Sequence, residues 1–181
     1  MPISNFVKRK LAMGFYRFDR DKNGVVEEAD LVQLGTAVAD RQGVPAESER
    51  YQKIVAAHHH WWDAYFKGGD ADGDGKVTLE EFWANVGRWV DTSSDAIAEA
   101  TGETELLFDA IDGNGNGMIN ADEFSTYLQA YGLTDADART AFAHLDRDKS
   151  GSISRGEFAR SMVEYYISES RGPSEWFYGG H

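Results

Sequence analysis

Residues 70–81 read DADGDGKVTLEE, an acidic segment of twelve residues with oxygen-bearing side chains at alternate positions. Aspartates occupy positions 1, 3 and 5: Asp70, Asp72 and Asp74. Gly75 follows at position 6, and Glu81 closes the segment at position 12. Calcium takes about six to eight oxygen ligands at roughly 2.3–2.6 Å, so short carboxylates folded around a sharp glycine turn can enclose it. The segment therefore predicts a calcium-binding loop.

The same arrangement recurs three more times. The other loops span residues 19–30, 112–123 and 146–157, and each has a glycine at position 6: Gly24, Gly117 and Gly151. A phenylalanine precedes every loop by four residues: Phe15, Phe66, Phe108 and Phe142. An incoming helix, a twelve-residue loop of this pattern and an exiting helix make up the EF-hand, so four hands are predicted.

Each loop is expected to bind Ca²⁺ through side chains at positions 1, 3, 5 and 12 and through the backbone carbonyl at position 7. In the first loop the predicted ligands are Asp19, Asp21, Asn23, Val25, Glu27 and Asp30. In the second loop they are Asp70, Asp72, Asp74, Lys76 and Glu81. In the third loop they are Asp112, Asn114, Asn116, Met118 and Glu123. In the fourth loop they are Asp146, Asp148, Ser150, Ser152 and Glu157.

The first loop departs furthest from the pattern because Asp30 stands where glutamate is expected. Aspartate is one methylene shorter and offers both oxygens less readily, so Glu27 at position 9 is expected to ligate directly. A tighter site of about six oxygens favours the smaller Mg²⁺. Before the second loop, Gly68 and Gly69 are expected to fray the incoming helix. The first hand is therefore predicted to be the weakest and the most tolerant of Mg²⁺, and the third and fourth to be the tightest.

Apolar residues flank the loops at fixed positions. Position 8 is β-branched in every loop: Val26, Val77, Ile119 and Ile153. Such residues suit a short strand by which two loops pair side by side. Each exiting helix carries two apolar residues at helical spacing: Leu31 and Leu34, Phe82 and Val86, Phe124 and Leu128, Phe158 and Met162. We predict a compact all-α fold of four EF-hands in two pairs, with short β pairing between adjacent calcium loops.

The incoming helices are predicted over residues 3–18, 46–67, 95–111 and 135–145. Thr134, with Asp137 three residues later, predicts a helix cap, and the polar segment 91–95 breaks the chain between the pairs. We expect an N-terminal pair over residues 1–91 and a C-terminal pair over 92–168. An aromatic tail, residues 169–181, is expected to pack on the body of one globule.

The chain has 181 residues and a net charge of −13, which disfavours nucleic acid as a partner. It has no cysteine, so neither disulfides nor thiol chemistry are expected. No stretch approaches a membrane span, and Met1-Pro2 lacks the glycine required for N-myristoylation, so no membrane anchor is expected. No catalytic constellation is present in the sequence. We expect a cytoplasmic, monomeric protein that is not an enzyme.

Four hands in this length, an enlarged first half, abundant aromatic residues and a tail after the last helix resemble the sarcoplasmic calcium-binding proteins and calerythrin. The resemblance covers nearly the whole chain. It implies that the two pairs pack against each other and that the protein acts as a calcium buffer or transporter. Members of that family often have one disabled hand, frequently the second, but the ligands of the second loop are intact here.

The main functional alternative is a calcium sensor that opens a Met-rich groove for target helices. The chain has four Met but five Trp, eight Tyr and ten Phe, and rings at this density favour a permanent core. A buffer is therefore preferred, and a protein target is not indicated. The tail residues Trp176, Phe177 and Tyr178 are predicted to fold back over the surface that a sensor would keep open.

A second alternative is a photoprotein-like or luciferin-binding protein that holds an apolar ligand. Such proteins share the four-hand architecture and place His, Trp and Tyr around an internal cavity. Two groups of residues suggest this comparison: His58, His59, His60, Trp61 and Trp62, and Trp176, Phe177, Tyr178 and His181. Consecutive histidines on a helix point in different directions, so a transition-metal site on this run is disfavoured.

Overall fold

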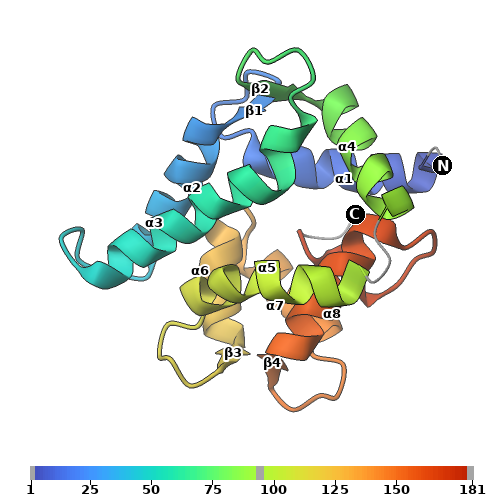
Figure 1. The fold of residues 1–181 in the computed structure, drawn as a ribbon. Helices are drawn as coiled ribbons and strands as arrows, with labels where there is room; N and C mark the ends of the chain where they lie inside the picture. The colour runs from blue at the N-terminus through green and yellow to red at the C-terminus, as the bar shows by residue number, and fades with distance from the viewer. Residues whose placement is uncertain (1–2, 93–95, 179–181) are drawn as a thin grey trace.

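The computed structural model describes residues 3–92 and 96–178. Within these ranges, eight α-helices form the body of the molecule (Figure 1). They are α1 (Asn5–Phe18), α2 (Glu28–Arg41), α3 (Glu49–Trp61), α4 (Leu79–Thr92), α5 (Ala96–Ile111), α6 (Ala121–Ala130), α7 (Asp135–Leu145) and α8 (Arg155–Ile167). The predicted all-α fold of four EF-hands is therefore confirmed. Every described helix is too short or too polar to cross a bilayer.

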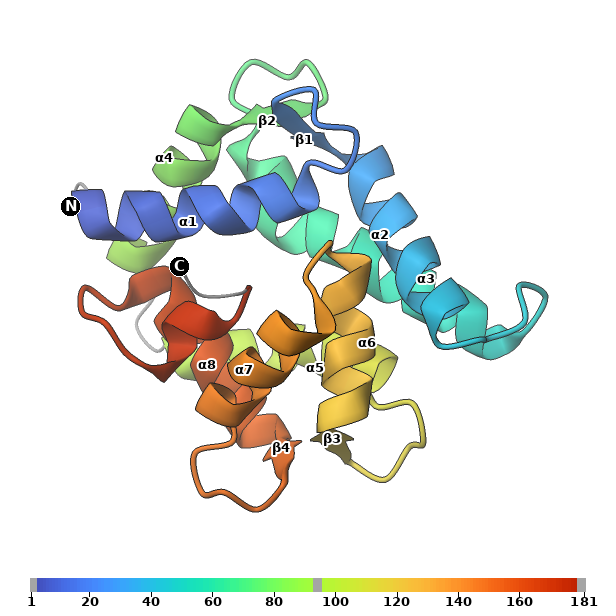
Figure 2. The ribbon, with the colours of Figure 1, turned by 180° about the vertical axis from the view of Figure 1, so that it is seen from behind.

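Two antiparallel strand pairs connect neighbouring loops. Strand β1 (Val25–Glu27) pairs with β2 (Lys76–Thr78), and β3 (Met118–Asn120) pairs with β4 (Ser152–Ser154). The β-branched residues of position 8 face each other in the register, Val26 with Val77 and Ile119 with Ile153, and all four are fully buried. Figures 1 and 2 show the two strand pairs at opposite ends of the molecule with the helices between them.

Aromatic residues before and after the loops meet in a shared core. Phe15, which enters the first hand, lies 5.7 Å from Phe82, which leaves the second, measured between ring centroids. Phe108 of the third hand lies 5.7 Å from Phe158 of the fourth. The remaining predicted core residues of the exiting helices are also buried: Leu31, Leu34, Val86, Phe124, Leu128 and Met162. Pairing of the loops thus brings incoming and exiting helices of different hands together.

The second incoming helix differs from the prediction of one helix over 46–67. Helix α3 starts at Glu49 because Ser48 caps it, accepting from the Tyr51 amide. It ends at Trp61, and a π-helical turn (Trp62–Phe66) and a 3₁₀ turn (Lys67–Gly69) follow. Trp61 and Trp62, on either side of this boundary, are both buried.

The other boundaries follow local signals. Helix α7 spans the predicted residues, and the Thr134 side chain accepts from the Asp137 amide as expected. Helix α1 begins at Asn5, two residues later than predicted, because Ser4 caps it. Helix α4 continues to Thr92, beyond the start of the predicted break, and residues 93–95 lie outside the described part of the chain.

The C-terminal segment runs back between the two halves. After a 3₁₀ turn (Pro173–Trp176), Phe177 and Tyr178 are fully buried, and Trp176 stacks on His144 with ring centroids 4.5 Å apart. The Tyr178 ring lies 5.4 Å from Phe18 of α1 and 6.0 Å from Tyr131 after α6. The tail therefore contributes core to the junction between the N-terminal and C-terminal pairs. His181 of the predicted aromatic group is outside the described residues.

Candidate calcium centres

The aspartate at position 1 organises every loop in the same way. One of its carboxylate oxygens accepts the amide N–H of the position-6 glycine: Gly24, Gly75, Gly117 and Gly151, at 2.8–3.0 Å. These glycines have φ between 80° and 91°, a left-handed conformation that side chains oppose. Each loop is thus wound around its first carboxylate, as a cation cage requires.

The carboxylate at position 12 ties the two ends of each loop together. One oxygen accepts the amide of position 9 at 2.9 Å in all four loops. The other oxygen accepts an amide near the loop start, from Arg20, Ala71, Asn114 or Arg147. Asp30 makes both contacts despite its shorter side chain. The backbone therefore adapts to the aspartate at this end of the first loop.

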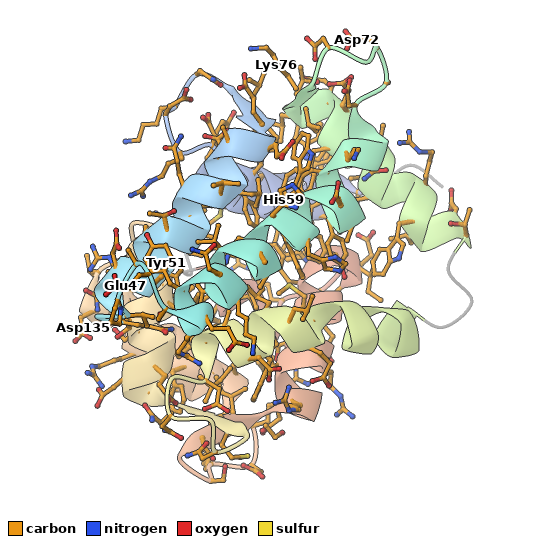
Figure 3. The ribbon with its side chains drawn as sticks, turned by 60° about the vertical axis from the view of Figure 1, so that its left-hand side comes forward. Glu47, Tyr51, His59, Asp72, Lys76 and Asp135 are labelled. Carbon is orange, nitrogen blue, oxygen red and sulfur yellow. The ribbon has the colours of Figure 1, made fainter. Side chains whose placement is uncertain are left out.

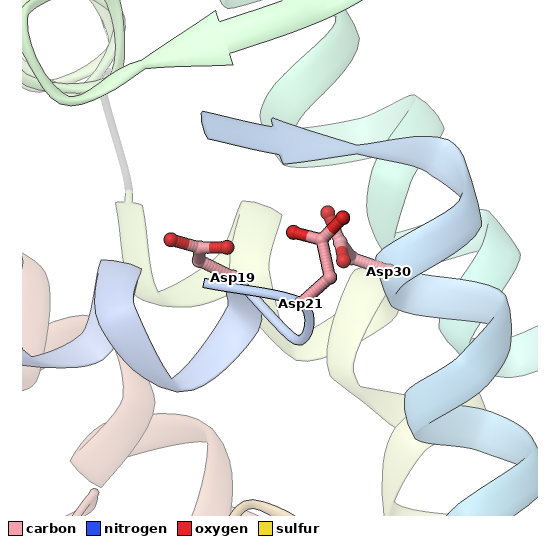
Figure 4. A group of neighbouring side chains, drawn as sticks. All are labelled: Asp19, Asp21 and Asp30. Carbon is pink, nitrogen blue, oxygen red and sulfur yellow. The ribbon is translucent and has the colours of Figure 1, made fainter. Parts of the chain in front are cut away.

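Three carboxylates gather in the first loop. Figure 4 shows Asp19 at the end of α1, Asp21 in the loop and Asp30 at the start of α2. Each offers an oxygen within 4.8 Å of the others. Burial raises the pKa of Asp30, and the nearby Asp21 and Asp19 charges add to the rise. The structure does not bring Glu27 into this group, because its carboxylate pairs with Lys76 Nζ at 2.6 Å.

The second loop is more exposed. Asp70, Asp72 and Asp74 offer oxygens within 4.8 Å of one another, and Figure 3 shows Asp72 and Lys76 at the outer end of the molecule. Glu81 accepts from the Thr78 amide and hydroxyl. The Thr78 and Ala71 amides hold the pKa of Glu81 below its usual value.

The third loop contains only two acids among its predicted ligands. Asn114 donates to Glu123 through its side chain at 2.8 Å, and Asn116 accepts the Met118 amide at 2.8 Å. The position-5 side chain accepts the position-7 amide in the first two loops as well: Asn23 accepts from Val25, and Asp74 accepts from Lys76. The amide carbonyls supply neutral oxygens where the other loops use more carboxylates.

The fourth loop gathers Asp146, Asp148 and Glu157, with oxygens within 4.8 Å of one another. The Ser150 hydroxyl donates to the Ser152 carbonyl at 3.0 Å, so the predicted ligands of positions 5 and 7 are in contact. Hydrogen bonds from Ser150 hold the pKa of Asp148 below its usual value. The donor set is therefore all oxygen, which suits a hard cation.

The first two histidines of the run lie in different surroundings. His58 is fully buried, its Nδ1 lies 2.8 Å from the Ile54 carbonyl, and burial lowers its pKa to about 4. His59 projects outward from α3 (Figure 3), where Nε2 contacts Glu28 at 2.8 Å and Nδ1 lies 3.7 Å from Asp63. The two side chains point in different directions, as their positions on the helix predict.

Sequence reasoning missed the contacts that reach these loops from outside. One is the ion pair of Lys76 with Glu27, which the strand register places opposite each other. The predicted pairing of the position-8 residues contains the signal for it. Three further contacts come from the N-terminal half. Gln42, Arg50 and Arg20 donate to carbonyls at the ends of the third hand's helices. Nothing in the local pattern points to them, because their partners lie 62 to 110 residues away.

These loops, held between paired helices, define a calcium-binding protein of the helix–loop–helix class. Comparison with known proteins agrees. A family model described as an EF-hand domain pair matches residues 103–163, and a model described as an EF hand matches residues 63–86. Calerythrin of Saccharopolyspora erythraea is 28% identical over 170 residues, covering 87% of this chain and 90% of its own. The luciferin-binding protein of Renilla reniformis is 35% identical over 175 residues, which cover 94% of this chain and 92% of that protein.

A solved structure, the calcium-loaded apo form of the coelenterazine-binding protein from Renilla muelleri, superimposes with a TM-score of 0.81 at 25% identity. It covers 99% of this chain and 100% of its own. The chain therefore belongs to the EF-hand calcium-binding proteins and is similar to calerythrin over most of its length.

Proposed function

We propose that the protein acts mainly as a calcium buffer or transporter and not as a calmodulin-like sensor. The main observation in support of this proposal is the burial of Phe177 and Tyr178 between the two halves. The Phe177 ring lies 5.4 Å from Phe158 and 6.4 Å from Phe124, both on exiting helices of the C-terminal pair. The tail thus occupies apolar surface of the kind that a sensor exposes to target helices.

Truncation before Pro173 tests the proposal. In the calcium-loaded state, the shortened protein is expected to bind more of a hydrophobic dye than the full chain and to lose a few kcal/mol of unfolding free energy, since buried rings are removed. Substitution of the exposed Tyr16 by Ser provides a control that removes a ring without opening the core. Tight binding of an amphipathic target helix by the intact, loaded protein would replace the buffer with the sensor.

The proposed capacity is four calcium ions, one for each loop, with the 21 predicted ligands in their assigned roles. Of these, Glu27 would ligate only after its carboxylate leaves Lys76. The first hand is proposed to be the weakest and to accept Mg²⁺. Calorimetric titration with calcium, with and without millimolar Mg²⁺, measures stoichiometry and competition together. A stoichiometry of three or fewer at saturating calcium contradicts the four-site proposal, and equal selectivity at every site contradicts the ranking.

Localisation, oligomeric state, partners and domain boundaries are proposed as well. We propose a cytoplasmic monomer without enzymatic activity, with calcium ions as its principal partner and no membrane anchor or nucleic-acid partner. The N-terminal pair is assigned to residues 1–91, the C-terminal pair to 92–168 and the tail to 169–181, joined in one globule. The continuous core supports this, because Phe18 of α1 packs on Tyr131 of the C-terminal pair at 5.7 Å.

A second candidate function is the binding of an aromatic ligand between the halves. Buried polar atoms support it: His58 Nε2, Trp61 Nε1 and Ser161 Oγ have no partner in hydrogen-bond geometry within the described chain. The Tyr127 and Tyr178 hydroxyls, by contrast, have hydrogen-bond partners in Tyr131 and Tyr166. A buried polar group without a partner costs about 1–3 kcal/mol, so a ligand that pairs with several of them would bind favourably.

The relatives suggest which ligand to test. The luciferin-binding protein and the coelenterazine-binding protein are named for small aromatic ligands, and coelenterazine is the natural probe. Incubation should quench tryptophan fluorescence, and His58→Gln should weaken binding while His59→Gln does not. Unchanged fluorescence at micromolar ligand, with and without calcium, excludes this candidate for coelenterazine.

A further inference from the structure

Both helices of the third hand are held at their C-terminal ends by side chains of the N-terminal half. Gln42, at the end of α2, donates through Nε2 to the Ala110 carbonyl of α5 at 2.8 Å. Arg50 of α3 donates through Nη2 to the Asp112 carbonyl at 3.1 Å. Arg20 donates through Nη1 to the Ala130 carbonyl, at the end of α6, at 3.0 Å.

These carbonyls are ones that a helix cannot satisfy by itself. The last four carbonyls of an α-helix lack an intrahelical partner, and the C-terminal end carries a partial negative charge. Ala110, Asp112 and Ala130 are all buried, at 4%, 3% and 1% exposure, so solvent reaches them poorly. A guanidinium group supplies both the missing donor and a complementary charge.

The contacts also connect with one another and with the calcium loops. Arg50 Nη2 bonds the Gln42 side chain at 3.2 Å, so the two donors support each other. Asp112 is the first ligand of the third loop, and its carboxylate accepts the Gly115 and Gly117 amides at 2.8 Å. Arg20 is position 2 of the first loop, and its amide donates to the position-12 carboxylate of Asp30.

We propose that Gln42 and Arg50 are positioning residues for the third calcium site. Together with Arg20 they form a cross-half clamp that makes calcium binding by the third hand depend on the N-terminal half. The clamp fixes the backbone at Asp112, so the first carboxylate enters the loop already oriented. The inference rests on the proposed binding of calcium by the third loop.

The other hands provide a matched contrast. Arg88 of α4 donates to the Gly68 carbonyl, just before the second loop, at 3.0 Å, but both residues belong to the same hand. Arg147, at position 2 of the fourth loop, pairs with Glu164 of its own hand. Lys10 of α1 also reaches the Ser168 carbonyl after α8 at 2.8 Å, so the fourth hand is held across the halves at one helix end. Among the described residues, only the third hand has both helix ends held from the opposite half.

The test uses the full chain and the amide resonances of the position-6 glycines. Each amide donates to the position-1 carboxylate of its own loop, so its chemical shift reports calcium in that loop. The variants are Arg50→Ala, Arg50→Lys, which keeps the charge and one donor, and the control Arg88→Ala. Gln42→Ala is a milder second variant that removes only the donor to Ala110.

In Arg50→Ala the calcium concentration at the midpoint of the Gly117 shift should rise about tenfold, equivalent to about 1.4 kcal/mol. The corresponding midpoint for Gly75 should change by less than about twofold. Arg50→Lys should recover much of the affinity, and Gln42→Ala should raise the Gly117 midpoint about threefold. Arg88→Ala should leave Gly117 unchanged. Because the third and fourth loops are paired, Gly151 is expected to follow Gly117 in part.

An unchanged Gly117 midpoint in both Arg50→Ala and Gln42→Ala overturns the clamp and leaves the calcium site in place. An equal shift at all four glycines also overturns it, because that result indicates general loss of stability. A wild-type Gly117 resonance that does not respond to calcium refutes the calcium site of the third loop, and the clamp with it.

Discussion

The N-terminal and C-terminal loop pairs share one backbone geometry and differ in charge where their strands meet. In the first pair, Glu27 at position 9 lies opposite Lys76 at position 7 of the partner loop. At the equivalent place in the second pair, Asn120 lies opposite Ser152. The amides of Glu27 and Asn120 both donate to the position-12 carboxylate at 2.9 Å. Hydrogen bonds from backbone amides to the position-12 carboxylate therefore give the loops a common shape, and we expect side-chain charge to distinguish their calcium affinities.

The difference extends to the carboxylate groups. The first two loops each gather three aspartates within 4.8 Å. In the second pair the fourth loop also gathers three carboxylates, but the third loop has two acids and two asparagines at its side-chain ligand positions. The N-terminal pair therefore carries more repulsion when no cation is present. Two carboxylates 4 Å apart repel by up to about 4 kcal/mol at an effective dielectric constant near 20.

Calcium removal is expected to give the largest contrast between the pairs. Chelation should lower the unfolding free energy by several kcal/mol, since each site at 100-fold excess over its dissociation constant contributes about 2.7 kcal/mol. The first two loops should open most, because their aspartates repel. Amide hydrogen exchange measures this, with loop 112–123 as the internal control. Faster exchange in that loop than in loop 70–81 contradicts the electrostatic contrast.

Acid should weaken the junction between the pairs through His58, whose ring lies 6.4 Å from Tyr127 and 6.3 Å from Tyr131. Burial lowers its pKa from 6.5 to about 4, so the unfolded chain binds the proton more tightly. Stability is therefore present above pH 6.5 and is lost as the pH falls towards 4, by about 3 kcal/mol.

Urea unfolding of the calcium-free protein at several pH values measures this loss. His58→Gln should flatten the pH dependence between 6.5 and 4, whereas His59→Gln should keep it, because His59 is outside the core. Identical pH profiles in the wild type and His58→Gln would show that other groups dominate acid sensitivity.

Exchanging the position-12 residues should reverse part of the contrast. Asp30→Glu is expected to raise the preference of the first hand for calcium over magnesium about tenfold, because the longer side chain offers both oxygens more readily. Glu123→Asp should lower the preference of the third hand by a similar factor. The Gly24 and Gly117 amide shifts follow the two sites. No change in either variant would mean that the backbone compensates for the missing methylene.

The smallest expected effect concerns the charge pair between loops. Lys76→Gln should strengthen calcium binding in the first hand about threefold, because it frees Glu27 and removes a nearby positive charge. The contact is partly exposed, with side chains 47% and 32% accessible, which limits its contribution. Ser152→Lys introduces a lysine opposite Asn120 and should weaken the third hand by a similar factor. Weaker binding after Lys76→Gln would show that the ion pair supports the first loop.

The sequence by itself determined the four loops and their pairing. The ligand spacing lies within twelve residues, and the glycine at position 6 permits the left-handed turn that each loop needs. Helix α7 follows in the same way, since Thr134 caps it directly. Val26 pairs with Val77 and Ile119 pairs with Ile153 across the strands. This was predictable because equivalent positions pair when two similar loops lie antiparallel.

Only the tertiary structure decided features that depend on distant partners. The helical period predicted one continuous helix over 46–67, but a π-helical turn follows Trp61, and its residues Trp62 and Phe66 are buried in the core. The contact from Arg50 to Asp112 joins residues 62 positions apart. Short-range patterns specify interactions within one turn or loop, but the residues that complete a helix end or a buried cluster are set by which surfaces meet when the two pairs pack together.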